Sequence, residues 1–297
     1  MQNLTKKQFD ILVALEEANN PMTQRELERV TEYSLGTINK TFRELVEKGL
    51  VKEGTITNAG INALEPYRAK RAIFIAAGFG SRLVPITFNT PKPLVRVNGT
   101  RMIDTLIDAC LEIGIDDIYI VRGYLAEQFD QLIYKYPMIK FLENPVYNEA
   151  NNISSALVAR YLLANSYVFE ADLVLKNSHI ISKYHYSSDF LAIKKERTDD
   201  WCFTVKDGEI VEQSLGGIDC WQMVGISYWN EHDGNRLSQD IPEVYNMPGG
   251  KERYWEQVPL IYRKNHYSVA VRECFDDDVI EIDTLNELKK VDKSYDV

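Results

Sequence analysis

The sequence of 297 residues lacks the features that mark membrane-spanning, secreted or disulfide-rich chains. No apolar run approaches the roughly 20 residues needed to span a bilayer. The first 20 residues carry acids where a signal peptide would have its apolar segment. Four cysteines, Cys110, Cys202, Cys220 and Cys274, show no C-x-x-C spacing, which argues against a zinc site or a disulfide framework. We therefore expect a cytoplasmic protein that has no contact with a membrane.

An excess of positive charge is also missing, because the formal net charge is −10. Residues 1–70 contain ten Lys/Arg and ten Asp/Glu and are neutral, so the surplus of acid lies in the remainder. A surface that gripped nucleic acid throughout would be basic instead. The length and the hydrophobic content of 45% favour two domains with at least one large core.

Residues 1–66 have the pattern of a small winged helix-turn-helix domain. Apolar residues recur at helical spacing between Thr5 and Ala18. Thr23 and Glu26 form a capping box that begins a second helix, and Gly49 ends a third. "LVKEGTITNAG" then predicts two short strands around a turn. This order, and "LVEKGLVKEG…TITNAG" in particular, resembles bacterial regulators of the multiple-antibiotic-resistance type.

The resemblance implies that the third helix enters the major groove of DNA. The residues that it would present there are Ser34, Thr37, Asn39, Lys40 and Arg43. The alternative is that the domain packs on the enzyme or on a partner and touches no DNA, since Glu44 and Glu47 lie on the same helix and the segment has no net positive charge. Winged helices often dimerise, so a homodimer is compatible with this interpretation.

After a polar linker at 67–71, residues 72–297 alternate apolar strands with helices. This alternation predicts an α/β fold with a Rossmann-like, mostly parallel mixed sheet. Ligands on such sheets bind beyond the carboxyl ends of the strands. The first strand of this domain runs directly into "AAGFGSRLVP", which makes that segment the first place to look for a site.

Gly78, Gly80, Ser81 and Arg82 follow this strand immediately. Backbone N–H groups and a cation in this position can hold a polyphosphate. The segment is neither a Walker loop nor a dinucleotide fingerprint, because it contains no G-K-[ST] and because Leu83, followed by Val84 and Pro85, stands where G-x-G-x-x-G requires its third glycine. For a bare G-x-G, an ordinary turn is the alternative.

The longer run "AAGFGSRL-x-P-(x5)-PKPL-x-x-V" resembles the signature of the nucleoside-triphosphate-dependent nucleotidyltransferases, the family of the sugar-nucleotide pyrophosphorylases. The resemblance implies that the glycine loop wraps the triphosphate, that Arg82 steadies the leaving pyrophosphate and that Lys92 neutralises charge near the α-phosphate. Attack on that phosphorus builds negative charge, which cations and amides at this spacing stabilise. Arg82, Lys92 and Asp172 are therefore the predicted catalytic residues.

This chemistry requires Mg²⁺ and hence carboxylates at strand ends. "YVFEAD" delivers Asp172, and "DVIEID" delivers Glu281 and Asp283. The family's metal-binding aspartate matches Asp172, and a second ligand matches Asp283 or Glu281. For Asp283 the alternative is a capping role before the helix "LNELKKV".

Further stretches, among them "RGYLAEQFDQL", "ENPVYNEANNISSALV", "EADLVLKN" and "VIEIDT", resemble the CTP:phosphocholine cytidylyltransferases across residues 71–292. The resemblance implies a cytosine site. Its predicted nucleotide-binding residues are Ala76, Ala77, Gly78, Gly80, Ser81, Arg82, Lys92, Gly123, Tyr124, Asn151 and Asn152. For one of the two asparagines, N-capping of the following helix is the alternative.

A quaternary ammonium is recognised by aromatic faces. The predicted acceptor-binding residues are Asn152, Trp201, Tyr228, Trp229, Tyr254 and Trp255. Asp199, Asp200 and Glu256 lie near the rings in sequence. Rings in short strands more often belong to a core, which is the alternative for each of them.

The sequence thus predicts a Mg²⁺-dependent enzyme that converts CTP and phosphocholine to CDP-choline and pyrophosphate. The nearest alternatives use phosphoethanolamine or 2-aminoethylphosphonate as acceptor, or another nucleotide with a sugar phosphate. From a different class, a DNA-binding regulator that senses a nucleotide or a choline ester also fits the two-domain order.

Overall fold

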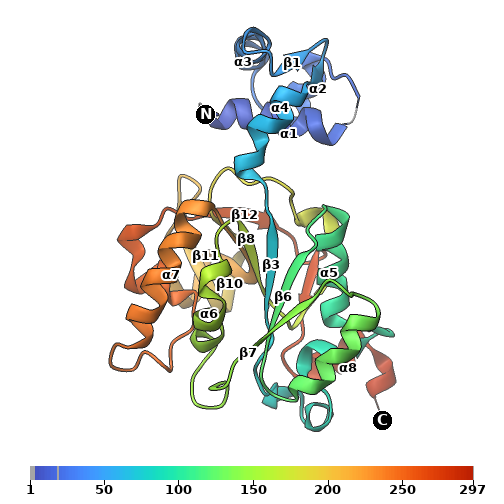
Figure 1. Cartoon of the computed structure of the whole chain (residues 1–297), viewed down its shortest axis with the longest axis vertical. Helices are drawn as coiled ribbons and strands as arrows, with labels where there is room; N and C mark the ends of the chain where they lie inside the picture. Colours follow the sequence, from blue (N-terminus) through green and yellow to red (C-terminus); the bar gives the residue numbers. More distant parts are fainter. Residues whose placement is uncertain (1–3, 19, 297) are drawn as a thin grey trace. The chain divides into compact units, whose positions relative to one another are not determined.

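The computed structural model describes residues 4–18 and 20–296 (Figure 1). The chain divides into two compact units, Met1–Arg68 and Ala69–Val297. Residues 67–71, expected as a linker, include the end of a 3₁₀ turn at Glu65–Tyr67 and the first residue of strand β3. Within the described residues, no helix is long and apolar enough to cross a membrane.

The described residues of the first unit form a winged helix of α-helices and one short hairpin. Its elements are α1 (Lys6–Ala18), α2 (Gln24–Thr31), α3 (Leu35–Glu47), β1 (Val51–Lys52), β2 (Thr55–Ile56) and α4 (Asn58–Leu64). Thr23 and Glu26 form the capping box of α2. Gly49 adopts a left-handed φ of 71° where α3 ends, a conformation that favours glycine.

A small apolar core holds these helices together. Its fully buried members include Ile11, Leu12, Leu27, Ile38, Leu45 and Leu64. On α3 this leaves Asn39, Lys40 and Arg43 exposed, together with Ser34 at the N-cap, while Thr37 is half-buried. The buried apolar face of α3 does not include Val46, which is 45% exposed.

The second unit is built on a mixed seven-stranded sheet of order β10-β12-β11-β8-β3-β6-β7, in which β10 also pairs with β11. Four neighbouring strands run parallel: β3 (Arg71–Ile75), β6 (Asp117–Arg122), β7 (Lys140–Glu143) and β8 (Ser166–Glu170). The long hairpin β10 (Asp189–Lys206) and β11 (Glu209–Trp229) extends the sheet, with β11 antiparallel to β8. Strand β12 (Ala270–Cys274) runs parallel to β10.

Helices cover both faces of this sheet and close two apolar cores (Figure 1). Helix α5 (Met102–Glu112) lies on one face, and α6 (Ile153–Ala159) and α7 (Glu231–Tyr245) lie on the other. The segment Ala126–Tyr134, whose amphipathic pattern predicts a helix, is a 3₁₀ helix. The remaining elements are small: β4 (Arg96–Val97), β5 (Thr100–Arg101), β9 (Leu173–Leu175), β13 (Val279–Glu281), α8 (Leu285–Val291) and a π-helical turn at Val258–Tyr262.

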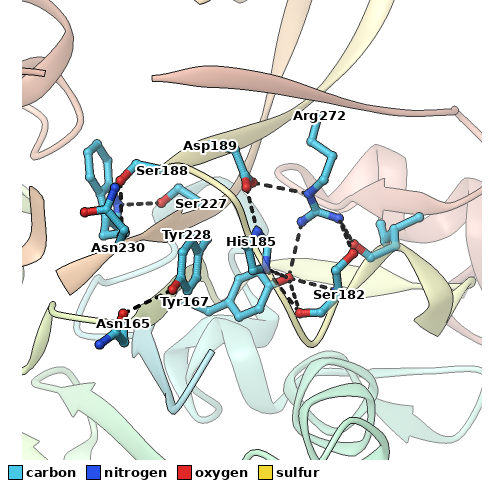
Figure 2. Close-up of polar contacts among 12 residues, drawn as sticks. Asn165, Tyr167, Ser182, His185, Ser188, Asp189, Ser227, Tyr228, Asn230 and Arg272 are labelled. Atoms are coloured by element: carbon cyan, nitrogen blue, oxygen red, sulfur yellow. Dashed lines mark hydrogen bonds and ion pairs between the residues drawn. The ribbon is translucent and has the colours of Figure 1, made fainter. Parts of the chain in front are cut away.

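A buried polar network fastens the antiparallel half of the sheet to the parallel half (Figure 2). His185 lies between Asp189 on β10 and Tyr167 on β8, with Nδ1 2.6 Å from the carboxylate and Nε2 2.7 Å from the phenol oxygen. Arg272 on β12 donates to Asp189 at 3.2 Å and to the Tyr167 hydroxyl at 3.3 Å. The Tyr228 ring stacks on His185 at 3.9 Å between centroids. Burial lowers the pKa of His185 despite the neighbouring carboxylate.

We predict that Asp189→Asn lowers the free energy of unfolding of the second unit by about 3 kcal/mol, because it removes a buried carboxylate and leaves the half-buried guanidinium of Arg272 without its partner. The matched control is Asp130→Asn, whose carboxylate pairs with Arg122 but is 64% exposed, and which should cost less than about 0.5 kcal/mol. Urea unfolding followed by tryptophan fluorescence measures both, since all four tryptophans lie in this unit. Equal effects of the two changes would contradict the prediction.

Candidate active site

A cavity of about 400 Å³ lies at the carboxyl ends of β3 and β8. The glycine loop after β3 and the residues that follow β8 form one side. The hairpin β10–β11 and the loop after α7 contribute the other side, and residues next to β13 complete it. The lining residues are Ile75, Ala76, Gly78, Gly80, Ser81, Arg82, Lys92, Pro93, Asn151, Asn152, Glu170, Ala171, Asp172, Asp200, Trp201, Met223, Gly225, Tyr254, Glu256, Glu281 and Asp283.

The glycine loop is shaped by the absence of side chains at two positions. Gly80 has a left-handed φ of 61°, and a Cβ there would lie 2.9 Å from Cβ of Lys92. At Gly78 a Cβ would meet no atom of the described residues within 4 Å, so the backbone borders open space. The loop therefore lies directly against Lys92 and leaves room for a ligand above Gly78.

Lys92 binds two aspartates, one that follows β8 and one that follows β13. Its Nζ lies 2.7 Å from Oδ2 of Asp172 and 2.7 Å from Oδ1 of Asp283, and its side chain is only 10% exposed. Burial alone would lower the pKa of Lys92, but the two carboxylates outweigh burial and hold that pKa above its usual value. Arg82 reaches the same Asp283 oxygen at 2.7 Å from a side chain that is 64% exposed.

Asp283 does not cap the helix that follows it. Thr284 is the N-cap of α8, and it forms a capping box with Glu287. The carboxylate of Asp283 binds Lys92 and Arg82 instead.

Three carboxylates converge beside Lys92. Glu170, Asp172 and Glu281 each offer an oxygen, and these oxygens lie within 4.8 Å of one another. Burial, then Asp172, Asp283 and Asp200, raise the pKa of Glu281 to about 8. Burial and the neighbouring acids raise the pKa of Glu170 well above its ordinary value. Three carboxylates this close together are electrostatically unfavourable unless bound protons or a cation offset their negative charge.

The donors of this cluster suit a hard divalent cation. Mg²⁺ prefers carboxylate oxygens and retains several waters. Oδ1 of Asp172 is buried and has no hydrogen-bond partner within the described part of the chain. Glu281 lies in the cluster, while Asp283 binds cationic side chains. Glu170 was not expected, although its position two residues before Asp172 in "YVFEAD" is the spacing that places side chains on one face of a strand.

Some residues predicted to bind the nucleotide are absent from this lining. The backbone N–H of Tyr124 donates to the Ala77 carbonyl at 3.1 Å, and the Tyr124 ring contacts Phe79 at 4.7 Å between centroids. At Gly123 a Cβ would lie 2.6 Å from the ring of Tyr147. These residues join the end of β6 to the flank of the glycine loop.

The two asparagines link the cavity to the loop after α7. Asn152 accepts a hydrogen bond from the backbone N–H of Trp255 at 2.8 Å and donates to Glu170 at 3.4 Å. Asn151 donates through its side chain to the Glu252 carbonyl at 3.1 Å. Asn152 occupies the N-cap position of α6 but makes no capping bond through its side chain.

The predicted aromatic cage is only partly present. Trp201 and Tyr254 line the cavity with ring centroids 5.9 Å apart. Tyr228 and Trp229 are fully buried core residues and are not part of a cage, which corrects the expectation. The reason is the direction of β11, which pairs Trp229 with Ser166 at the amino end of β8, whereas the cavity lies at the carboxyl end.

Trp255 is likewise a core residue, 3% exposed, with its ring 5.8 Å from Trp229. It borders a small space beside the main cavity and does not line the cavity itself. Its neighbour Glu256, noted in the sequence only as an acid near the rings, does line the cavity. Burial raises the pKa of Glu256 to about 7.

Comparison with known proteins agrees with this geometry. The family model described as nucleotidyl transferase matches residues 71–212, and the model described as MarR family matches residues 2–56. The 2-aminoethylphosphonate cytidylyltransferase of Lancefieldella rimae is 37% identical over 231 residues, which cover 75% of this chain and 92% of that protein. The choline-phosphate cytidylyltransferase of Streptococcus pneumoniae is 32% identical over 228 residues, which cover 75% and 97%.

Among solved structures, the CTP:phosphocholine cytidylyltransferase from Streptococcus pneumoniae (LicC) is 31% identical with a TM-score of 0.70, over 76% of this chain and 99% of that one. The fold and the site thus define a nucleotidyltransferase that is preceded by a MarR-like winged helix. Within this class, the chain belongs to the family of the cytidylyltransferases.

We predict that Mg²⁺ raises the unfolding temperature of the protein and that Asp172→Asn removes this effect, because the change deletes a carboxylate of the cluster. The same change should lower turnover at least about 100-fold while leaving the circular dichroism spectrum intact. The control is Asp276→Asn, an acid that is 71% exposed and outside the lining of this cavity. Retention of both the thermal shift and turnover in Asp172→Asn would remove Asp172 from the metal site.

Proposed function

We propose that this cytidylyltransferase transfers the cytidylyl group of CTP to a small acceptor that carries a phosphonate or phosphate and a primary ammonium, with 2-aminoethylphosphonate as the first candidate. The observation that carries this proposal is the composition of the acceptor side of the cavity. Two rings, Trp201 and Tyr254, lie there with the carboxylates of Asp200 and Glu256. A primary ammonium prefers carboxylates and hydrogen bonds, whereas a quaternary ammonium prefers ring faces. The relative from Lancefieldella rimae supports the same acceptor.

The reaction needs alignment and charge neutralisation more than proton transfer. An oxygen of the acceptor phosphonate attacks the α-phosphorus of CTP, and the bond from this phosphorus to the bridging oxygen of pyrophosphate breaks. The attacking oxygen is already anionic near neutral pH, so no general base is required. The glycine loop holds the triphosphate, and Arg82 and Lys92 stabilise the charge that develops on it.

Lys92 has a second role in this mechanism. By binding Asp172 and Asp283 together, it fixes the strand ends against which the phosphates would lie. Glu170, Asp172 and Glu281 would hold the divalent ion, Mg²⁺ being the one expected. When bound, such an ion offsets negative charge on the phosphates.

Phosphocholine is the second candidate acceptor. The edge-to-face pair of Trp201 and Tyr254 favours it, since two rings at the cavity still offer faces to a quaternary ammonium. The relative and the solved structure from Streptococcus pneumoniae favour it as well.

Pyrophosphate release separates these acceptors. CTP, UTP, dTTP and ATP are each combined with 2-aminoethylphosphonate, phosphoethanolamine, phosphocholine and glucose 1-phosphate in the presence of Mg²⁺. We predict turnover with CTP alone, with kcat/KM at least about tenfold higher for the primary amines than for phosphocholine, the size expected from one hydrogen bond to a charged group. Turnover confined to phosphocholine would contradict the primary-amine acceptor, and no turnover with any pair would contradict the enzyme.

For the N-terminal unit we propose DNA binding through α3. Asn39, Lys40 and Arg43 are exposed along this helix, and the unit matches the MarR family. The neutral charge of residues 1–70 predicts weak binding without the right sequence, because phosphate contacts supply most non-specific affinity.

We predict that the chain retards the DNA upstream of its own gene in a gel-shift at about 50 mM salt and that Arg43→Ala weakens this binding about tenfold or more. Lys7→Ala removes an exposed charge from α1 and serves as the control. If the two variants bind DNA equally well, or if the full chain does not bind this DNA, α3 is not a recognition helix.

A further inference from the structure

Glu256 is a buried acid in the cavity wall whose role is not explained by the metal cluster. Glu256 is only 2% exposed, yet it lines the cavity. Oε2 has no hydrogen-bond partner within the described part of the chain. A carboxylate oxygen in this state costs free energy unless a ligand pairs with it.

The other buried or half-buried charges of the cavity already have partners or belong to the acidic cluster, and Asp200, which also lines the cavity, is exposed. Glu170, Asp172 and Glu281 form the cluster that suits a divalent ion, and Glu256 lies outside it. Among the residues described as lining this cavity, the cations are Arg82 and Lys92, and both bind Asp283.

The lining therefore holds six carboxylates against two cationic side chains. CTP and a phosphonate add further negative charge, and one divalent ion offsets only two charges. A positive group on the acceptor is the remaining source of compensation, and a buried carboxylate oxygen without a hydrogen-bond partner, such as Oε2 of Glu256, is where such a group gains most.

The shape of the wall at Glu256 limits the size of that group. Beside the main cavity lies a small space of about 10 Å³, bordered by Val168, Glu170, Phe190, Met223, Gly225, Ser227, Trp255 and Glu256. This volume is close to that needed for one water-sized group. A primary ammonium that entered this space would fit there, whereas a nitrogen with three methyl groups would need the wider main cavity, which Glu256 also lines.

The residue next to Glu256 is fixed in the core, and the wall opposite is closely packed. Asn152 accepts a hydrogen bond from the neighbouring N–H of Trp255 at 2.8 Å, and the Trp255 ring lies in the core against Phe190 and Trp229. At Gly225 a Cβ would lie 2.7 Å from Cβ of Glu170, so a side chain there would crowd the wall of the small space. The carboxylate is thus preorganised for a ligand.

We propose that Glu256 binds the primary ammonium of the acceptor and thereby selects primary amines over quaternary ones. The ammonium donates a hydrogen bond to Oε2, which a trimethylated nitrogen cannot do because it carries no N–H. This inference rests on the proposed function, since it assigns the residue that recognises the proposed acceptor.

The test is Glu256→Gln, which keeps the size of the side chain and removes its charge. We expect KM for 2-aminoethylphosphonate to rise about 10- to 100-fold, the range for a hydrogen bond between charged groups, with KM for CTP unchanged. KM for phosphocholine should change less than about twofold, so the preference for the primary amine collapses. The control is Glu252→Gln, an exposed acid in the same loop. The unfolding temperature of Glu256→Gln should not fall, because the change removes an unpaired buried charge.

Calorimetric binding of 2-aminoethylphosphonate to the wild type and to Glu256→Gln gives a readout that does not depend on turnover. Suppose that the wild type turns over primary amines. If Glu256→Gln then binds these amines as tightly as the wild type does, or if its affinity for CTP and phosphocholine falls as much as its affinity for the amines, the assignment of Glu256 is overturned and the proposed function stands. If the wild type binds the phosphonate without turnover, the proposed function fails, and loss of binding in the variant still supports the assignment. If the wild type neither binds nor turns over primary amines, both fail.

Discussion

The contact of Lys92 with Asp172 and Asp283 is the constraint on which the site depends. It joins three segments that are far apart in the sequence: the end of the glycine motif, the end of β8 and the segment after β13. Gly80 packs directly on the same lysine, so the position of the phosphate loop is tied to the two acids. Removing the ammonium would leave two half-buried carboxylates without their cation and would release the contact between all three segments.

The charge balance of the cavity follows from this contact. Because Lys92 and Arg82 bind Asp172 and Asp283, the proposed metal ion and the ammonium of the proposed acceptor would supply the positive charge that offsets the remaining acids. The raised pKa values of Glu170 and Glu281 express the same imbalance in the protein alone. An enzyme built in this way assembles its full electrostatic complement only when metal and both substrates are present.

Much of the fold, and the fact that the glycine loop, Lys92 and Asp172 line one cavity, could be predicted from the sequence. Local signals, such as the glycines after β3, the capping box at Thr23 and acids at strand ends, depend on neighbouring residues that the sequence displays directly. The segment Ala126–Tyr134 shows the limit of periodicity, because an amphipathic pattern does not distinguish an α-helix from a 3₁₀ helix.

The acceptor half could not be predicted in the same way. Alternation along β11 indicates which residues face the core, but not that this strand runs antiparallel to β8 and carries Tyr228 and Trp229 away from the cavity. Glu170 lay within reach of the sequence argument through its spacing from Asp172. Glu256 did not, because its burial depends on Asn152 and the core position of Trp255, about 100 residues apart in the chain.

The two sides of the cavity come from different parts of the mixed sheet. Parallel strands and their short loops line the side proposed to bind the nucleotide, whereas the long hairpin and the loop after α7 line the side proposed to bind the acceptor. Evolution could therefore exchange acceptors by altering the hairpin and this loop, while the nucleotide side stayed intact. That relatives of similar identity carry the names of different acceptors but a common cytidylyl donor is the outcome expected of such a division.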